Sequence, residues 1–189
     1  MTDLWDAPAV IELEPHADDR GSLTELWKNS AFYLEGGFTV EQVNITHSRL
    51  GVLRGLHYSR KPQGKLIVCV AGQIQDVAVD LRVGSPTFGL STTANLNDTG
   101  GRAFWVPPGF GHGFLTLSPV STVVYLLTSE HSPEDEDGVY ALNPSLNVPW
   151  LFDEFLGGHV FTMSDRDRDA VSLMAAMREG RLPVYKEIP

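Results

Sequence analysis

Two histidines stand beside glycines, in positions where an imidazole could do chemistry. His57 follows the run Arg-Gly-Leu, and His112 lies between two glycines; both runs are typical of turns. Small neighbours leave room for a ligand or for the close approach of another backbone segment. Arg54 and Lys65 flank His57 in the sequence, so one strand-turn-strand unit could present a base between two cations to an anionic or carbonyl ligand. The alternative is two structural histidines beside a solvated basic edge.

Two further side chains could complete an acid–base set, although each has an ordinary structural explanation. Tyr125 lies in an apolar run typical of a strand, where an aromatic residue usually serves packing. Asp167 lies near the start of an expected helix, where aspartate commonly caps the backbone. Taken singly, these positions do not indicate a function.

A metal site is not favoured by the histidine spacing. The chain has one cysteine, Cys69, and no pair of histidines with HxH or HExxH spacing. The histidines are His16, His47, His57, His112, His131 and His159. A metal held by ligands that are distant in the sequence stays open as an alternative.

The segments that must position these residues are mostly short β-strands. Runs rich in valine, isoleucine and leucine alternate with turn residues, which predicts strands at residues 66–70, 74–81, 103–106, 114–117 and 123–127. The polar–apolar alternation of residues 76–80 predicts a half-buried strand. Many short strands without intervening helices favour a β-sandwich or jelly roll over a βαβ fold.

The two ends of the chain differ from this pattern. We predict strands at residues 10–13 and 38–43 around a short helix at residues 29–34. Residues 164–167 are typical of a helix start, and residues 170–178 continue as a short helix. We therefore expect one domain over residues 1–189: N-terminal strands in 1–45, a β core in 46–150 and a C-terminal helical extension in 151–189.

Charge and cysteine content limit the partners and the compartment. Lysine and arginine total 14 against 24 acidic residues, a formal charge of −10, which argues against nucleic acid or an anionic membrane as partner. The lone Cys69 permits no intrachain disulfide and is expected to be a buried apolar side chain. The N-terminus is acidic, no signal-like stretch is visible and no segment reaches the ~20 apolar residues of a membrane span. We expect a cytoplasmic protein.

Together, several runs resemble the dTDP-4-dehydrorhamnose 3,5-epimerase family. They are GVLRGLHY at 51–58, QGKL at 63–66, DVAVDLRVGSPTFG at 76–89, PPGFGHGF at 107–114 and NPSL at 143–146. The resemblance covers about residues 18–170 in the family's order. It implies a jelly-roll cupin with short C-terminal helices, usually a homodimer whose subunits exchange N-terminal strands. It also implies a dTDP-linked 4-keto-6-deoxysugar as substrate and no metal or organic cofactor.

The resemblance assigns roles position by position. His57 matches the base, Asp167 the acid that orients it, Tyr125 the proton donor and Lys65 the cation beside the sugar C4 oxygen. Substrate-binding positions are matched by Arg20, Glu25, Gln42, Asn44, Arg54, His112, His131, Glu136 and Arg166. The family supplies the contacts matched by Arg20 and Glu25 from the neighbouring subunit. His131 departs from the family, which often has a tyrosine that stacks on thymine there.

The implied chemistry suits these residue types. A proton beside a ketone is acidic only if the enolate is stabilised, and C3 and C5 both flank the C4 ketone, so Lys65 could serve both. His57 would remove the proton, since imidazole titrates near neutral pH. The expected reaction is epimerisation at C3 and C5. Alternatives are a mono-epimerase on this or another nucleotide sugar, a non-catalytic cupin that binds a sugar nucleotide, and a metal-dependent cupin such as a dioxygenase.

Overall fold

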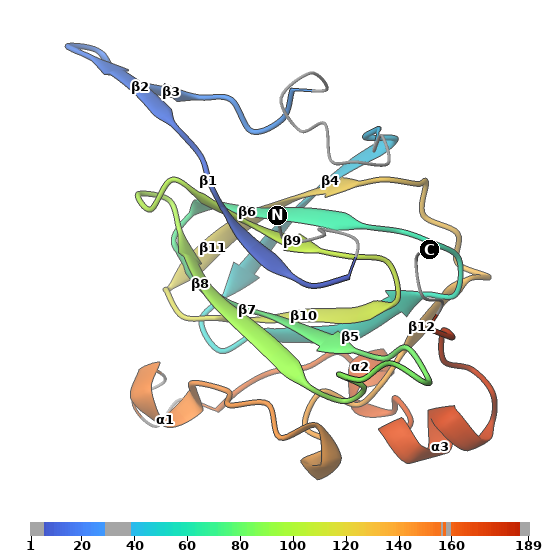
Figure 1. The fold of residues 1–189 in the computed structure, drawn as a ribbon. Helices are drawn as coiled ribbons and strands as arrows, with labels where there is room; N and C mark the ends of the chain where they lie inside the picture. The colour runs from blue at the N-terminus through green and yellow to red at the C-terminus, as the bar shows by residue number, and fades with distance from the viewer. Residues whose placement is uncertain (1–5, 29–38, 156, 158–159, 186–189) are drawn as a thin grey trace.

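Two five-stranded antiparallel sheets form the body of the protein (Figure 1). The computed structural model describes residues 6–28, 39–155, 157 and 160–185. The first sheet contains, in spatial order, β1 (Ala9–Glu12), β9 (Arg102–Val106), β6 (Lys65–Ala71), β11 (Val120–Leu127) and β4 (Gln42–Arg49). The second contains β12 (Glu136–Gly138), β5 (Leu53–Ser59), β10 (Phe110–Thr116), β7 (Gln73–Asp80) and β8 (Ser91–Asn97).

Three apolar layers explain this sandwich. The central layer joins side chains of both sheets, among them Ile67 and Phe104 from the first and Ile74 and Phe114 from the second. A second layer covers the outer face of the second sheet with the C-terminal segment. A third lies over the first sheet, around Trp105. The mostly β jelly-roll sandwich expected from the sequence is confirmed.

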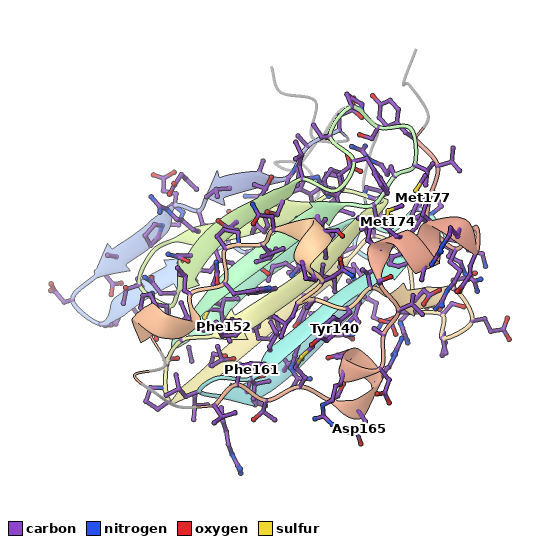
Figure 2. All side chains as sticks on the ribbon, turned by 90° about the horizontal axis from the view of Figure 1, so that it is seen from below. Tyr140, Phe152, Phe161, Asp165, Met174 and Met177 are labelled. Carbon is purple, nitrogen blue, oxygen red and sulfur yellow. The ribbon has the colours of Figure 1, made fainter. Side chains whose placement is uncertain are left out.

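The C-terminal segment covers one face of the sandwich with short helices (Figure 2). They are the 3-10 helix η1 (Pro144–Leu146), α1 (Phe152–Phe155), α2 (Asp165–Arg168) and α3 (Leu173–Arg178). Ser164 and Ser172 cap α2 and α3 by accepting hydrogen bonds from backbone N–H groups of the first turn. Helix α2 therefore begins where the sequence predicts. The predicted helix at 170–178 starts later, at Leu173, because Val171 pairs with Val139 and its carbonyl accepts from Tyr140.

The N-terminal residues form a strand and then a hairpin that projects from the body (Figure 1). Strand β1 pairs with β9 of the same chain, while β2 (Pro15–Asp18) and β3 (Gly21–Thr24) pair only with each other among the described strands. The strand predicted at 38–43 is wrong in its bounds, because β4 runs over residues 42–49 along β11. The helix predicted at 29–34 lies outside the described residues. Among the described residues, no helix is long and apolar enough to cross a membrane.

The glycines beside the two histidines belong to strands and not to turns, which corrects the sequence interpretation. Gly55 lies in β5 and Gly113 in β10. A Cβ on Gly55 would lie 2.6 Å from the carbonyl oxygen of His112, and one on Gly113 would lie 2.5 Å from that of Arg54. The glycines therefore let two adjacent strands approach closely beside a bulge in their pairing. Residues 76–80 are also buried throughout and not half-buried, because the central apolar layer covers one face of β7 and the C-terminal segment covers the other.

Candidate active site

A cavity of about 210 Å³ opens between the two sheets. The first sheet contributes Lys65, from the start of β6, and Tyr125, from β11. The second sheet contributes His57 from β5 and His112 from β10. The other lining residues are Asn44, Thr46, Arg54, Gln63, Gly113, Phe114, Leu127, His131 and Glu136. The fold thus brings together residues that lie up to 92 positions apart in the sequence, from Asn44 to Glu136.

His57 and Asp167 form a carboxylate–imidazole pair at one side of this cavity. Nε2 of His57 lies 2.6 Å from Oδ1 of Asp167, whose Oδ2 accepts a weaker hydrogen bond of 3.3 Å from the Gly55 backbone N–H. Burial raises the pKa of Asp167, but the hydrogen bond and charge of His57 outweigh it, so the pKa lies below its ordinary value. The carboxylate is therefore ionised and fixes Nε2 as a protonated nitrogen, which leaves Nδ1 to accept a proton.

The helix cap explains why Asp167 reaches this position. Asp167 is the third residue of α2, and its N–H donates to the Ser164 hydroxyl that starts the helix. Ser164, and not Asp167, is therefore the residue that caps the helix. The interpretation of Asp167 as an ordinary helix cap is wrong. The side chain of Asp167 is buried while that of His57 is 28% exposed, so the pair presents the imidazole and not the carboxylate to the cavity.

Lys65 and Tyr125 face the pair from the opposite sheet. Burial lowers the pKa of Lys65, and the nearby carboxylates of Glu136 and Asp76 oppose that shift. Burial raises the pKa of Tyr125, with a further rise from Asp76. The phenol of Tyr125 thus stays protonated at neutral pH. An oxyanion bound beside Lys65 would favour its ammonium form, because little solvent is present to stabilise that charge.

A second carboxylate–imidazole pair lies behind the cavity wall. Nε2 of His112 lies 2.6 Å from Oδ1 of Asp76, and both side chains are buried. The ring of His112 meets that of Tyr125 edge-on, with centroids 5.8 Å apart. Sequence reasoning singled out His112 but missed Asp76. The available signal was a carboxylate inside a predicted strand, because a carboxylate that such a strand buries rarely lacks a partner.

Hydrogen bonds and ion pairs link the polar residues at the rim. The Gln42 side chain donates to Asn44 and accepts from the backbone N–H of His131, at 2.8 and 2.7 Å. Glu136 pairs with Arg166 at 2.9 Å. Burial raises the pKa of Glu136, but the Arg166 hydrogen bond and the charges of His57, Arg166 and His131 together outweigh burial and hold this pKa below its ordinary value. Asn44, His131 and Glu136 line the cavity, whereas Gln42 and Arg166 support its edge.

Two predicted site residues are not brought to this cavity. Arg20 lies on the projecting hairpin with its side chain 89% exposed and paired with Asp18. Glu25, just after the hairpin, is exposed and pairs with Lys28. Neither lines the cavity of its own chain. Conversely, the cavity includes Thr46 of β4 and Gln63 of the loop between β5 and β6. The sequence assigned neither a role, because isolated polar residues carry no distinctive pattern.

The described residues contain no cluster of three or more histidine, cysteine, aspartate or glutamate side chains that could hold a metal ion. Of the three histidines that line the cavity, His57 and His112 each use Nε2 on a carboxylate. What the arrangement offers is a base, a phenol and an ammonium around one small volume. That set can move protons on carbon next to a carbonyl group.

Comparisons with known proteins agree with this geometry. A family model described as dTDP-4-dehydrorhamnose 3,5-epimerase matches residues 2–175. A Mycobacterium tuberculosis protein of that name is 39% identical over 188 residues, which cover 96% of this chain and 92% of the relative. A Streptomyces protein named dTDP-4-dehydro-6-deoxyglucose 3-epimerase is 40% identical over 187 residues, covering 96% and 90%.

A solved structure shares the fold over nearly the whole chain. It is a dTDP-6-deoxy-D-glucose-3,5-epimerase from Legionella pneumophila in complex with dTDP-4-keto-L-rhamnose. The TM-score is 0.87 at 36% identity, and the match covers 95% of this chain and 94% of the other.

Proposed function

Since the chain belongs to the dTDP-4-dehydrorhamnose 3,5-epimerase family, we propose that it epimerises dTDP-4-keto-6-deoxy-D-glucose at C3 and C5 to give dTDP-4-keto-L-rhamnose. The observation that carries the proposal is the pairing of His57 with Asp167 across a cavity from Lys65 and Tyr125. The Legionella complex supports the choice of a dTDP-linked keto sugar, because its ligand is named as the expected product.

The first step is the removal of a proton from carbon. Nδ1 of His57 takes the proton from C5, and the electron pair of the C–H bond moves onto the C4 oxygen to form an enolate. Asp167 stabilises the imidazolium that results, since its ionised oxygen lies 2.6 Å from Nε2. The ammonium of Lys65 stabilises the negative charge at O4, where charge develops in the transition state.

The second step returns a proton from the other sheet. Tyr125 donates its phenolic proton to the opposite face of the same carbon, which inverts the configuration, and the enolate electrons restore the C4 ketone. Because Tyr125 is held in its protonated form, it is ready to donate. The phenolate then recovers a proton from solvent and His57 releases one, so the site is reset. The same sequence at C3 uses the same oxyanion, because C3 also adjoins C4.

The polar rim holds the rest of the substrate in this proposal. Arg54 can bind diphosphate oxygens through two guanidinium hydrogen bonds, and its Nε already donates to the Ser48 hydroxyl, which fixes its direction. His131 offers an imidazole to stack on thymine. Gln42, Asn44, Glu136 and Arg166 complete the nucleotide and sugar contacts.

We also propose a homodimer in which Arg20 and Glu25 reach the partner's site. The support is that Arg20 is exposed on a hairpin that projects from the body and does not line its own cavity (Figure 1). The apolar side chains of Leu23 on this hairpin and Val43 on the edge strand β4 are 63% and 60% exposed, which suits an interface. In this proposal residues 1–189 form a single domain, and residues 1–45 are shared between the subunits. We also propose that the protein is located in the cytoplasm.

Mixed dimers of Arg20→Ala and His57→Asn chains test the shared site. If Arg20 serves the partner, one site of each heterodimer carries both lesions and the other carries neither. Purified heterodimers should then keep about half of the wild-type activity. Complete loss of activity would contradict the shared site.

A C3-only epimerase is the second candidate, because the Streptomyces relative of that name is as similar to this chain as the 3,5-epimerases are. Both activities use the same base and oxyanion stabiliser, and the position of the sugar decides which carbon loses its proton. Borohydride reduction of the product, followed by identification of the configuration at C3 and C5, separates them. Inversion at both carbons supports the 3,5-epimerase, and inversion at C3 alone shifts the assignment to the second candidate.

A further inference from the structure

Asp76 has no assigned role in the reaction as described so far, although its partner His112 matches a substrate-binding position. Asp76 is 0% exposed, and Oδ1 lies 2.6 Å from Nε2 of His112. Its Oδ2 has no hydrogen-bond partner among the described residues. An ionised carboxylate is costly to bury, the more so with one oxygen unpaired. Its strand is buried on both sides, so an apolar residue of similar size would serve packing better.

The pair is placed beside the reacting volume. His112 lies on β10 between Asp76 on β7 and His57 on β5, and it is in register with His57. His112 lines the cavity and meets Tyr125 edge-on, whereas Asp76 does not line the cavity. Any influence of Asp76 on a substrate must therefore pass through His112 or act through its charge.

The carboxylate determines what His112 can offer a ligand. A carboxylate only accepts hydrogen bonds, so Nε2 of His112 carries the hydrogen, and Nδ1 of the neutral ring has a lone pair. Such a nitrogen can accept from a hydroxyl but cannot bind the C4 oxygen, which is itself an acceptor. A sugar hydroxyl beside the ketone is the group of the proposed substrate that fits.

We propose that Asp76 is a positioning residue that holds His112 in its Nε2–H form, so that Nδ1 accepts a hydrogen bond from a sugar hydroxyl adjacent to the C4 ketone. This inference rests on the proposed function. The hydrogen bond from the sugar hydroxyl to His112 fixes the sugar ring between His57 and Tyr125. The position of the ring decides how the C–H bonds align with the base. The charge of Asp76 also opposes the effect of burial on the pKa of Lys65.

Asp76→Asn tests the proposal, because an amide can donate to Nε2 and no longer enforces this form. Loss of a charge-assisted hydrogen bond predicts a kcat about 10- to 100-fold lower, whereas the affinity for dTDP, which lacks the sugar, should change less than about twofold. In the double variant with His112→Phe, the second substitution should cost little more than the first. A wild-type kcat in Asp76→Asn would overturn the proposal, and so would losses that add in the double variant.

Asp80→Asn is the matched control. Asp80 is another fully buried aspartate of β7, but it accepts hydrogen bonds from Arg82, Ser85 and Thr87 away from the cavity. Its loss should lower stability and leave the kcat of the folded protein unchanged. If Asp76→Asn behaves in the same way, Asp76 is only structural and the proposal fails.

A measurement on the wild-type protein covers the case in which Asp76→Asn does not fold. Nitrogen-15 NMR of histidine-labelled protein, with the His112 signals identified by their loss in His112→Phe, reports which ring nitrogen carries the hydrogen. The proposal predicts Nε2–H with an unprotonated Nδ1, and an Nδ1–H form would overturn it. The NMR measurement does not depend on enzymatic activity. A wrong tautomer of His112 can therefore be distinguished from a failure of the proposed function, which would appear as wild-type protein without epimerase activity.

Discussion

Asp167→Asn is the most informative change to the proposed base, because the structure predicts which way the new amide turns. In the wild type, Oδ2 accepts from the Gly55 N–H and Oδ1 faces Nε2 of His57. The amide oxygen of asparagine must take the place of Oδ2 to keep the Gly55 bond. The amide NH2 then faces His57 and donates to Nε2, so the hydrogen of the neutral ring moves to Nδ1. That nitrogen can no longer accept a proton from carbon.

The expected magnitude follows from this reversed tautomer. A lost charge-assisted hydrogen bond alone lowers the rate about 10- to 100-fold. An asparagine that imposes the wrong tautomer on a catalytic histidine has a cost of about 10⁴-fold in the serine-protease triad. We therefore expect kcat to fall at least about 10³-fold in an NMR assay of product formation, with dTDP affinity unchanged by calorimetry. A variant that keeps more than a tenth of the wild-type kcat would refute the assignment of Asp167 as the partner of the base.

Three further changes test the scaffold, the proton donor and the buried charges. Gly55→Ala should lower the free energy of unfolding in urea by at least about 2 kcal/mol, because the residue has a φ of +109° and the new methyl would lie 2.7 Å from Gly113 Cα; unchanged stability would contradict the close approach of the strands. Tyr125→Phe should slow product formation about 10²-fold or more at unchanged dTDP affinity, and a wild-type rate would exclude Tyr125 as donor. Burial raises the pKa of Asp80, but its hydrogen bonds dominate and hold it below the ordinary 3.8, so its stabilising effect is present above about pH 4 and is lost as the pH falls through the folded-state pKa. In Asp80→Asn the free energy of unfolding should therefore fall less steeply as the pH is lowered. A pH dependence equal to that of the wild type would refute the role of Asp80 in acid unfolding.

The sequence predicts the β architecture well because apolar periodicity and turn residues are local signals. The strands predicted from residues 66, 74, 103 and 123 onward all occur, with bounds that differ by one to three residues. Strand β5 was missed, since its one glycine, Gly55, resembles a turn residue in the sequence. The structural reason for this glycine is its contact with β10, 58 positions further along at Gly113, and no local pattern reveals such a contact.

The site was predictable only in part, for the same reason. The pairing of His57 with Asp167 spans 110 positions and came from the family resemblance, and the structure brings the two side chains together. Asp76 was missed because alternation along residues 76–80 suggested a solvent-facing side, whereas the apolar layers on the two faces of the sheet bury both sides of β7. The exposed position of Arg20 depends on how the hairpin projects, which hydrophobic patterning does not determine.

The most direct test of the proposed reaction is proton exchange followed by NMR in D₂O, with the purified protein, dTDP-4-keto-6-deoxyglucose and no added metal. We predict that deuterium enters at both C3 and C5 with the wild-type protein, and that exchange is abolished in His57→Asn while dTDP still binds. Exchange at both carbons that persists in His57→Asn would contradict His57 as the base. The absence of enzyme-dependent exchange at either carbon in the wild type would contradict the 3,5-epimerase function itself.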